Sequence, residues 1–222
     1  MSGEISAAPR RAYQKRRRAE REDETRRRIT EATVALHGTV GPARTTVSAI
    51  AERAGVQRAT VYRHFPDERA LIGACSAHWR EANPRPDISG WAAVEDPDAR
   101  LRSGLAELYA WYDRTEYMLE KITRDAAVVE PLRQQLAGVA GWYAAAADVL
   151  AEGRSGDAAL GRAAIAHALG FDTWRSLVRR QGLSPEDAVD LMARLAACAE
   201  PPPSPPPAAP GRRSPRAARR GR

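Results

Sequence analysis

The chain is predicted to be all-α by two observations. Apolar residues recur at steps of three and four along most of its 222 residues, and no stretch shows the period-two alternation of a strand. Helix-start and helix-stop residues divide this pattern into segments of helix length. With 43% apolar residues, the chain can bury one sizeable core, or the cores of a small and a larger domain.

The first 40 residues change character near residue 22. Residues 1–21 carry seven basic and two acidic side chains, have no apolar face, and are predicted to be a disordered basic arm. From Asp23 onward the pattern is helical, and it stops near Gly38 and Gly41. One side of this first helix carries Ile29, Ala32, Thr33, Leu36 and His37.

Residues 45–71 contain two short amphipathic segments hinged at 54–56. The first has one apolar face, formed by Val47, Ile50, Ala51 and Ala54. Thr46 precedes this segment and can cap its free amide groups. Gly55 follows it, where a left-handed residue would end a helix. A helix of about two turns and a tight turn are therefore predicted.

The second segment interleaves inward-packing residues with hydrogen-bond donors. The inward residues are Val56, Ala59, Val61 and Phe65. The donors are Arg58, Thr60, Tyr62, Arg63 and His64. Taken singly, an arginine is usually a solvated charge and a tyrosine a half-buried packing residue. Together at this spacing, the donors suit phosphates and base edges, which favours a helix-turn-helix that enters a DNA groove.

The same stretch closely resembles the DNA-binding domain of the TetR family of transcriptional regulators. The resemblance covers residues 22–80 and is strongest over 45–71, in the pattern Thr45-Thr46, Ile50-Ala51, Ala54-Gly55-Val56, Thr60, Tyr62, His64-Phe65 and Leu71. It implies that Thr46, Thr60, Tyr62 and His64 hold the DNA backbone. It further implies that Arg58, Ala59 and Arg63 face the major groove.

Two neighbouring features qualify these roles. Pro66-Asp67-Glu68 stands where many family members have a lysine that touches phosphate, so that contact is expected to be missing or to pass to Arg69. Asp67 and Glu68 would instead stabilise the positive end of the next helix. In the first helix, the run 26–28 of three arginines is expected either to approach flanking phosphates or to form a solvated face.

A further helix is predicted over 66–82, and a break follows it. Leu71, Ile72, Ala74, Cys75 and Trp79 face inward on that helix. Residues 83–97 contain three prolines and a glycine, so the domain boundary is placed there, with Trp91 as a packing plug. The predicted organisation is an arm at 1–21, a DNA-binding domain at 22–82, a linker at 83–97, an effector-binding and dimerisation domain at 98–200, and a disordered Pro/Arg-rich tail at 201–222.

The larger domain is predicted to contain five helices, over 97–114, 116–129, 130–152, 156–181 and 184–199. Proline opens two of them at Asp96-Pro97 and Glu130-Pro131. Gly153 and Gly182 follow helix ends, and Ser184 begins a capping sequence.

Aromatic and apolar side chains cluster on three of these helices. They form either the core of a helical bundle or a pocket for a planar or amphipathic ligand, where family members keep their effector site. The candidate pocket residues are Leu105, Leu108, Tyr109, Tyr112, Tyr117, Met118, Trp142 and Phe171.

The last two helices carry long apolar stripes with small residues that would let helix axes approach closely. The resemblance implies a four-helix dimer interface, whereas the alternative is packing within one chain. A dimer is favoured because so small a DNA-binding head needs two half-sites, about 34–36 Å apart. The candidate interface residues are Ala163, His167, Gly170, Trp174, Leu191 and Leu195.

Charge is unevenly distributed. Residues 81–200 carry thirteen basic and nineteen acidic side chains, a net charge of −6, whereas 201–222 carry six basic and no acidic ones. Both basic ends are expected either to add phosphate contacts without sequence preference or to act only as solubilising tails.

Several protein classes are disfavoured by what the sequence lacks. We find no phosphate-binding glycine loop, nucleophile elbow or metal-ligand cluster, so no enzyme, cofactor or metal is expected. No membrane or export segment is present, which favours a cytoplasmic protein. Cys75 and Cys198 are expected to be reduced, buried thiols, with a redox switch as the alternative.

The predicted function is that of a homodimeric, sequence-specific transcriptional repressor. It would bind a palindromic operator in double-stranded DNA and leave it when a small-molecule effector binds. The alternative is an architectural DNA-binding protein without an effector, in which the arginine-rich ends dominate the affinity.

Overall fold

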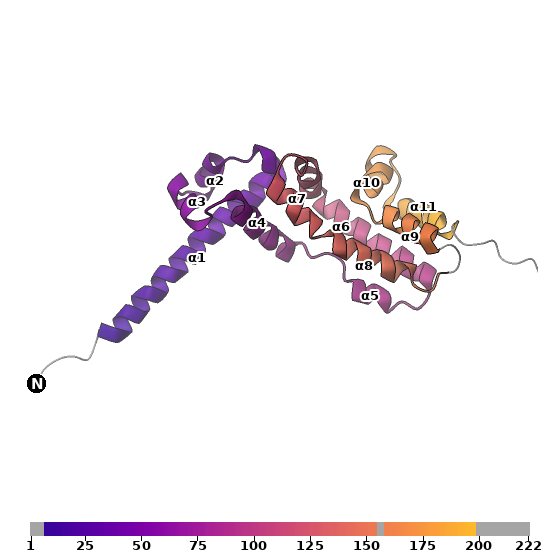
Figure 1. The fold of residues 1–222 in the computed structure, drawn as a ribbon, viewed down its shortest axis with the longest axis horizontal. Coiled ribbons are helices and arrows are strands. Elements are labelled where there is room, and N and C mark those ends of the chain that lie inside the picture. The colour runs from indigo at the N-terminus through magenta and orange to yellow at the C-terminus, as the bar shows by residue number, and fades with distance from the viewer. Residues whose placement is uncertain (1–6, 155–157, 199–222) are drawn as a thin grey trace, which may run out of the picture.

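The computed structural model describes residues 7–154 and 158–198, and within these ranges every regular element is a helix. This confirms the predicted fold class. Figure 1 shows an elongated molecule in which α1–α4 form one end and the remaining helices form the other. The predicted tail at 201–222 and residues 1–6 of the predicted arm lie outside the described residues.

The first helix is longer than predicted. α1 spans Ala7–Thr39, so residues 7–21 are helical where the sequence analysis predicted a disordered arm. Good helix formers fill this stretch, and pairs at a spacing of four residues support it, with Arg16 2.9 Å from Glu20 and Arg18 3.1 Å from Glu22. The N-terminal half of α1 projects away from the rest of the molecule in Figure 1.

Three further helices pack against the second half of α1 to form the head. These are α2 (Val47–Ala54), α3 (Arg58–His64) and α4 (Glu68–Ala82), with a short 3₁₀ turn η1 (Pro42–Arg44) before them. Their shared core contains Ile29, Ile50, Ala54, Val61 and Phe65, all fully or almost fully buried. The predicted inward faces of these helices are therefore confirmed for those residues.

The predicted helix ends of the head are confirmed by their capping contacts. The Thr46 hydroxyl accepts a hydrogen bond from the Ala49 amide at 3.2 Å and so caps α2. Gly55 ends α2 in the left-handed conformation, with φ of 64°. The Asp67 carboxylate accepts from the Ala70 amide at 2.7 Å, so α4 begins at Glu68, two residues after the predicted start.

The helices after the head, α5 to α11, form the body of the molecule. They are divided differently from the prediction. α6 runs without interruption over Pro97–Asp125, where two helices were predicted. The predicted helix over 130–152 is divided into α7 (Glu130–Ala137) and α8 (Ala140–Ala151). A short helix, α5 (Ile88–Ala92), lies inside the predicted linker and buries Trp91, which confirms the predicted packing role of that side chain.

The predicted helix over 156–181 is also divided. α9 (Ala158–Ala168) ends before Gly170, and a single turn, α10 (Phe171–Trp174), continues into a π-helix over Arg175–Arg180 (η2). The turn at Gly170 carries Phe171 and Trp174 into the body core. The last helix, α11 (Pro185–Ala197), begins at the predicted cap, where Ser184 accepts from the Asp187 amide at 3.0 Å.

Candidate nucleic-acid interface and effector cavity

Helix α3 has one buried face and one open face. Val61 and the adjoining Phe65 are buried in the head, which fixes the orientation of the helix. The open face carries Arg58, Ala59, Tyr62 and Arg63, all of them exposed, with Tyr62 at 50% exposure. Within the described residues, the guanidinium groups of Arg58 and Arg63 make no hydrogen bond or ion pair, so both are available to a partner.

The other predicted DNA-contacting residues flank this open face. Thr60 and His64 are half-buried, and Thr46 lies exposed at the start of α2. Burial, reinforced by the positive charges of Arg63 and Arg26, lowers the pKa of His64, so its imidazole is neutral at neutral pH. Its Nε2 atom is buried without a hydrogen-bond partner among the described residues.

The three consecutive arginines of α1 have different contacts. Arg26 donates to the His64 carbonyl at 2.7 Å, and its guanidinium lies 4.2 Å from the centre of the Phe65 ring. Arg28 donates to the carbonyls of Ala54 and Gly55 at the turn of the helix-turn-helix. Both arginines therefore link α1 to α2 and α3 through backbone carbonyls, although both residues remain exposed. A phosphate contact by either residue stays a prediction.

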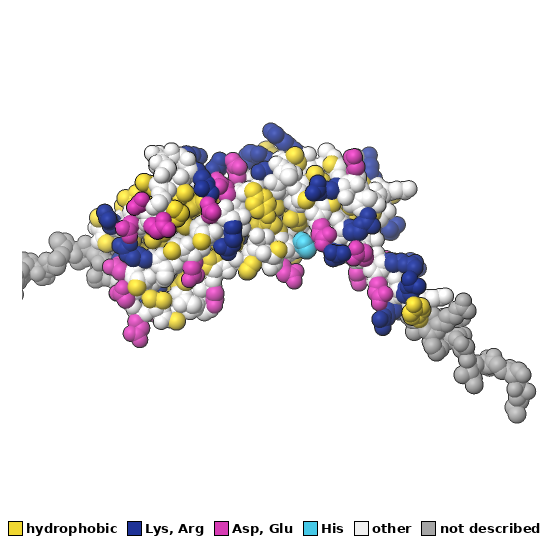
Figure 2. Space-filling view, turned by 180° about the vertical axis from the view of Figure 1, so that it is seen from behind, with side chains coloured by type: hydrophobic (Ala, Val, Ile, Leu, Met, Phe, Trp, Pro, Cys, Tyr) yellow, Lys and Arg dark blue, Asp and Glu magenta, His cyan; other side chains and the backbone are white. Residues whose placement is uncertain are grey.

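Arg27 forms exposed ion pairs with Glu24 and Glu31, each at 2.8 Å, as expected of a residue on a solvated face. Farther along α1, Lys and Arg side chains cover the projecting segment that extends past the head. Figure 2 shows this concentration of basic side chains at one end of the molecule, with acidic side chains scattered over the body.

Residues 29–75 match the family model described as bacterial regulatory proteins of the tetR family. The chain carries the DNA-binding domain of the TetR family. The match spans the last third of α1, the helix-turn-helix and the first half of α4, so it includes every residue of the helix-turn-helix predicted to contact DNA. The resemblance inferred from the sequence is confirmed.

Solved structures of transcriptional regulators share the fold over most of the chain. A TetR transcription regulator from Haloarcula marismortui is 18% identical, with a TM-score of 0.57, and the match covers 80% of this chain and 98% of that one. A transcriptional regulator from Rhodococcus sp. is 16% identical, with a TM-score of 0.54 and coverage of 78% and 95%. A search of curated proteins finds no match. In the described part of this TetR-type chain, no helix is both long and apolar enough to cross a membrane.

The predicted pocket residues lie mostly in the packed core of the body. Leu105, Leu108, Tyr109, Tyr112, Met118 and Phe171 are all buried there. The hydroxyl of Tyr109 donates to the Ala168 carbonyl at 3.0 Å, and that of Tyr112 donates to the Leu169 carbonyl at 2.5 Å. Both hydroxyls are hydrogen-bonded to carbonyls inside the protein. This cluster is therefore the core of a helical bundle rather than an open ligand site.

The two remaining candidates lie nearer the surface. Tyr117 is about half exposed and accepts a hydrogen bond from the indole of Trp79 at 3.2 Å. Trp142 is partly buried against the body core.

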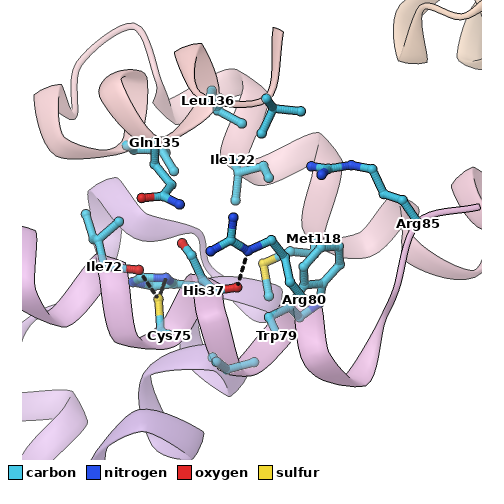
Figure 3. A pocket seen from close by; sticks show the side chains of 14 residues that line it. His37, Ile72, Cys75, Trp79, Arg80, Arg85, Met118, Ile122, Gln135 and Leu136 are labelled. Carbon is cyan, nitrogen blue, oxygen red and sulfur yellow. Dashed lines mark hydrogen bonds between the residues drawn. The ribbon is translucent and has the colours of Figure 1, made fainter. Parts of the chain in front are cut away.

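A cavity of about 60 Å³ lies beside this cluster, between the head and the body. Its walls come from α1, α4, α6 and α7 and from the segment after α4, and of the eight predicted residues only Met118 lines it. Figure 3 shows His37, Cys75 and Trp79 on one side of it and Ile122, Gln135 and Leu136 on the other. Arg80 and Arg85 also line it, and no role was predicted for either residue.

The predicted dimer-interface residues separate into two groups. Ala163, His167, Leu191 and Leu195 are exposed on α9 and α11, and each leucine is 44% exposed. Trp174, by contrast, is 0% exposed and stacks on Phe171 within the core, so its prediction as an interface residue is wrong. Gly170 is half-buried at the turn before α10, where the predicted continuous helix does not exist.

The two cysteines also differ from each other. Cys75 is buried, as predicted, with its sulfur 3.5 Å from Nδ1 of His37, and burial raises its pKa to about 12. Cys198 is exposed at the end of α11, contrary to the expectation of two buried thiols.

Proposed function

We propose that this TetR-type DNA-binding regulator is a homodimeric repressor that leaves its operator when a small molecule binds. The open face of α3 carries the proposal. Arg58 and Arg63 have no internal partner among the described residues, and Tyr62 projects beside them, as expected of a helix that contacts base edges and phosphates.

The proposed dimer would use the neighbouring helices α9 and α11. These two helices pack against each other and expose Leu191, Leu195, Ala163 and His167 on the outside of the body. A second copy related by two-fold symmetry would bury the same side chains from both subunits. It would also carry two α3 helices, which a palindromic operator requires.

The proposed effector response would use the cavity between head and body. A molecule bound there would touch α4, which belongs to the head, and α6 and α7, which belong to the body. Release requires the ligand to prefer the arrangement in which the two heads do not fit the operator. A coupling free energy of about 1–3 kcal/mol would weaken operator binding roughly 5- to 150-fold.

Selection of bound sequences from a random DNA pool, with the full chain at roughly physiological salt, tests the DNA-binding part. We expect one palindromic motif with half-sites about one helical turn apart. Recovery of DNA without any motif would overturn the proposal and favour an architectural protein. In vitro transcription from a promoter that overlaps the recovered site then tests repression, because an activator would raise the transcript instead.

A further inference from the structure

We propose that the cavity between head and body binds a small organic carboxylate. The Arg85 guanidinium would pair with the carboxylate, and the hydrocarbon part would lie against Met118 and Ile122. Binding itself does not depend on the function proposed above. Only its effect on operator affinity rests on that function.

The charge of the cavity is the first argument. Its lining includes two arginines, Arg80 and Arg85, and neither an aspartate nor a glutamate. Burial lowers the pKa of Arg85, and the nearby positive charge of Arg80 adds to that effect. Arg80 is exposed and Arg85 is half-buried, and no anionic side chain of the lining offsets the cost of burying Arg85.

Arg85 is exceptional among the arginines of the described chain. Four others are buried or half-buried, and each has acceptors: Arg100 donates to backbone carbonyls, whereas Arg102, Arg154 and Arg175 pair with Asp190, Asp98 and Glu120. Arg85 is also half-buried, yet its Nε is enclosed without any hydrogen-bond partner among the described residues. In these four arginines the protein itself supplies the hydrogen-bond acceptor. Because Arg85 has no such acceptor, we infer that a ligand supplies it.

Aromatic rings hold Arg85 in place without neutralising it. Its guanidinium carbon lies 5.7 Å from the centre of the Trp111 ring and 5.6 Å from that of Trp142. Rings at these distances position a cation but leave its N–H groups without acceptors. Figure 3 shows the Arg85 side chain reaching toward the cavity from the segment after α4, with the Gln135 amide on the far side.

The rest of the lining selects an apolar anion. The lining also contains polar residues, among them His37, Ser76 and Gln135, but Ile72, Met118, Ile122, Leu136 and Val139 offer no hydrogen bonds. A phosphate facing these apolar residues would leave oxygens unsatisfied. A carboxylate has two oxygens that fit the guanidinium fork, and its carbon chain suits these walls. The volume of about 60 Å³ is well below that of sites for drug-sized molecules, which favours a ligand of only a few carbons.

Titration of the full chain, followed by tryptophan fluorescence, tests the proposal because Trp79, Trp111 and Trp142 lie at the cavity or against Arg85. The probes are propionate, butyrate, hexanoate and benzoate, each beside its uncharged amide, with inorganic phosphate as a simple anion. We expect at least one carboxylate to bind at least about tenfold more tightly than its amide and than phosphate. Equal affinity for acid and amide, equal affinity for phosphate, or no binding by any carboxylate would overturn the proposal.

Two variants and one control locate the binding. Arg85→Gln should weaken carboxylate binding at least about tenfold and leave amide binding unchanged, whereas Arg85→Lys should retain part of the affinity. Arg133→Gln removes an exposed arginine of α7, outside the cavity lining, and should bind like the parent chain. Circular dichroism checks that each variant is folded. A loss of binding in Arg133→Gln equal to that in Arg85→Gln would contradict the assignment to Arg85.

The DNA measurement is kept separate from the ligand measurement. If a carboxylate binds through Arg85 but operator affinity is the same with and without it, the cavity assignment stands and effector-controlled release fails. If operator binding is specific and no carboxylate binds, the cavity assignment fails and the DNA-binding function stands.

Discussion

The arginines of the head differ in what they contact, although their side chains are identical. Arg26 and Arg28 of α1 are used internally, against the backbone of α2 and α3. Arg58 and Arg63 of α3 have no such use within the described residues. An arginine without an internal acceptor keeps all its donors for a base edge or a phosphate, and this distinction depends on geometry rather than on residue type.

Substitution of two neighbours on α3 should separate base contacts from backbone contacts. Arg63→Ala should cost about 1–3 kcal/mol of operator affinity and relax the preference at one base position. Tyr62→Phe should weaken binding to all sequences about equally, because it removes a hydroxyl assigned to the DNA backbone. Binding curves on the operator and on variants with single base changes measure both effects.

The role assignment would be wrong if both substitutions relaxed the same base preference. Arg53→Ala is a suitable control, since Arg53 is exposed on α2 outside the open face of α3 and should leave the base preference unchanged.

A buried histidine should make the stability of the protein depend on pH. Burial lowers the pKa of His37 to about 4, from about 6.5 in the unfolded chain, against an opposing effect of Asp125. The folded state therefore holds this ring neutral. Its contribution to stability is fully present above about pH 6.5 and is lost as the pH falls toward 4.

Urea denaturation of the parent chain and of His37→Gln, at pH 7 and at pH 5, measures this contribution. We expect the parent to lose about 2 kcal/mol more than the variant over that interval, since a glutamine does not titrate. Parallel losses in the two proteins would show that other groups cause the acid sensitivity.

At the scale of the element, α1 supports α3 through the side chain of Arg26. Arg26 reaches both the carbonyl at the end of α3 and the face of Phe65, which follows it. Arg26→Ala should destabilise the protein by about 1–2 kcal/mol through the loss of one charged hydrogen bond and one cation–π contact. It should also weaken DNA binding without changing the base preference, because α3 loses support and not a base contact.

The adjacent substitution Arg27→Ala is the matched control. Arg27 has only exposed ion pairs with Glu24 and Glu31, so urea denaturation should show no measurable change. A loss of stability from Arg27→Ala as large as that from Arg26→Ala would contradict the supporting role of Arg26.

Helix ends were predicted correctly where a capping residue lies next to the helix in the sequence, and incorrectly where no such residue is present. Thr46 and Ser184 each accept from an amide three residues on, and the Gly55 amide donates to carbonyls of the last turn of α2, so these capping roles follow from adjacent sequence. The interior of α6 has no comparable signal. At the predicted break, Thr115 is fully buried and donates to the Trp111 carbonyl at 2.5 Å within one continuous helix.

At the scale of the whole molecule, the proposed dimer would use the exposed Leu191 and Leu195 of α11 beside α9. Replacing Leu191 and Leu195 together by glutamate should convert a dimer into a monomer, because two charges would then be buried at the interface of each subunit. Sedimentation velocity at micromolar concentration measures the oligomeric state.

The control for this change is Val128→Glu, since Val128 is 76% exposed and lies after the end of α6, away from α9 and α11. That variant should sediment like the parent chain. A parent chain that is already monomeric would overturn the dimer proposal.

The sequence alone determined the helical class and the helix-turn-helix with its caps and inward faces, because these depend on residues close together along the chain. The individual residues proposed to contact DNA came from the resemblance to the TetR family. Tertiary structure decided which arginines link α1 to α2 and α3 and which remain open, that Trp174 is core, and that Arg80, Arg85 and Met118 share a cavity. Those outcomes depend on side chains from α1, α4, α6 and α7, and no local periodicity encodes which of them meet.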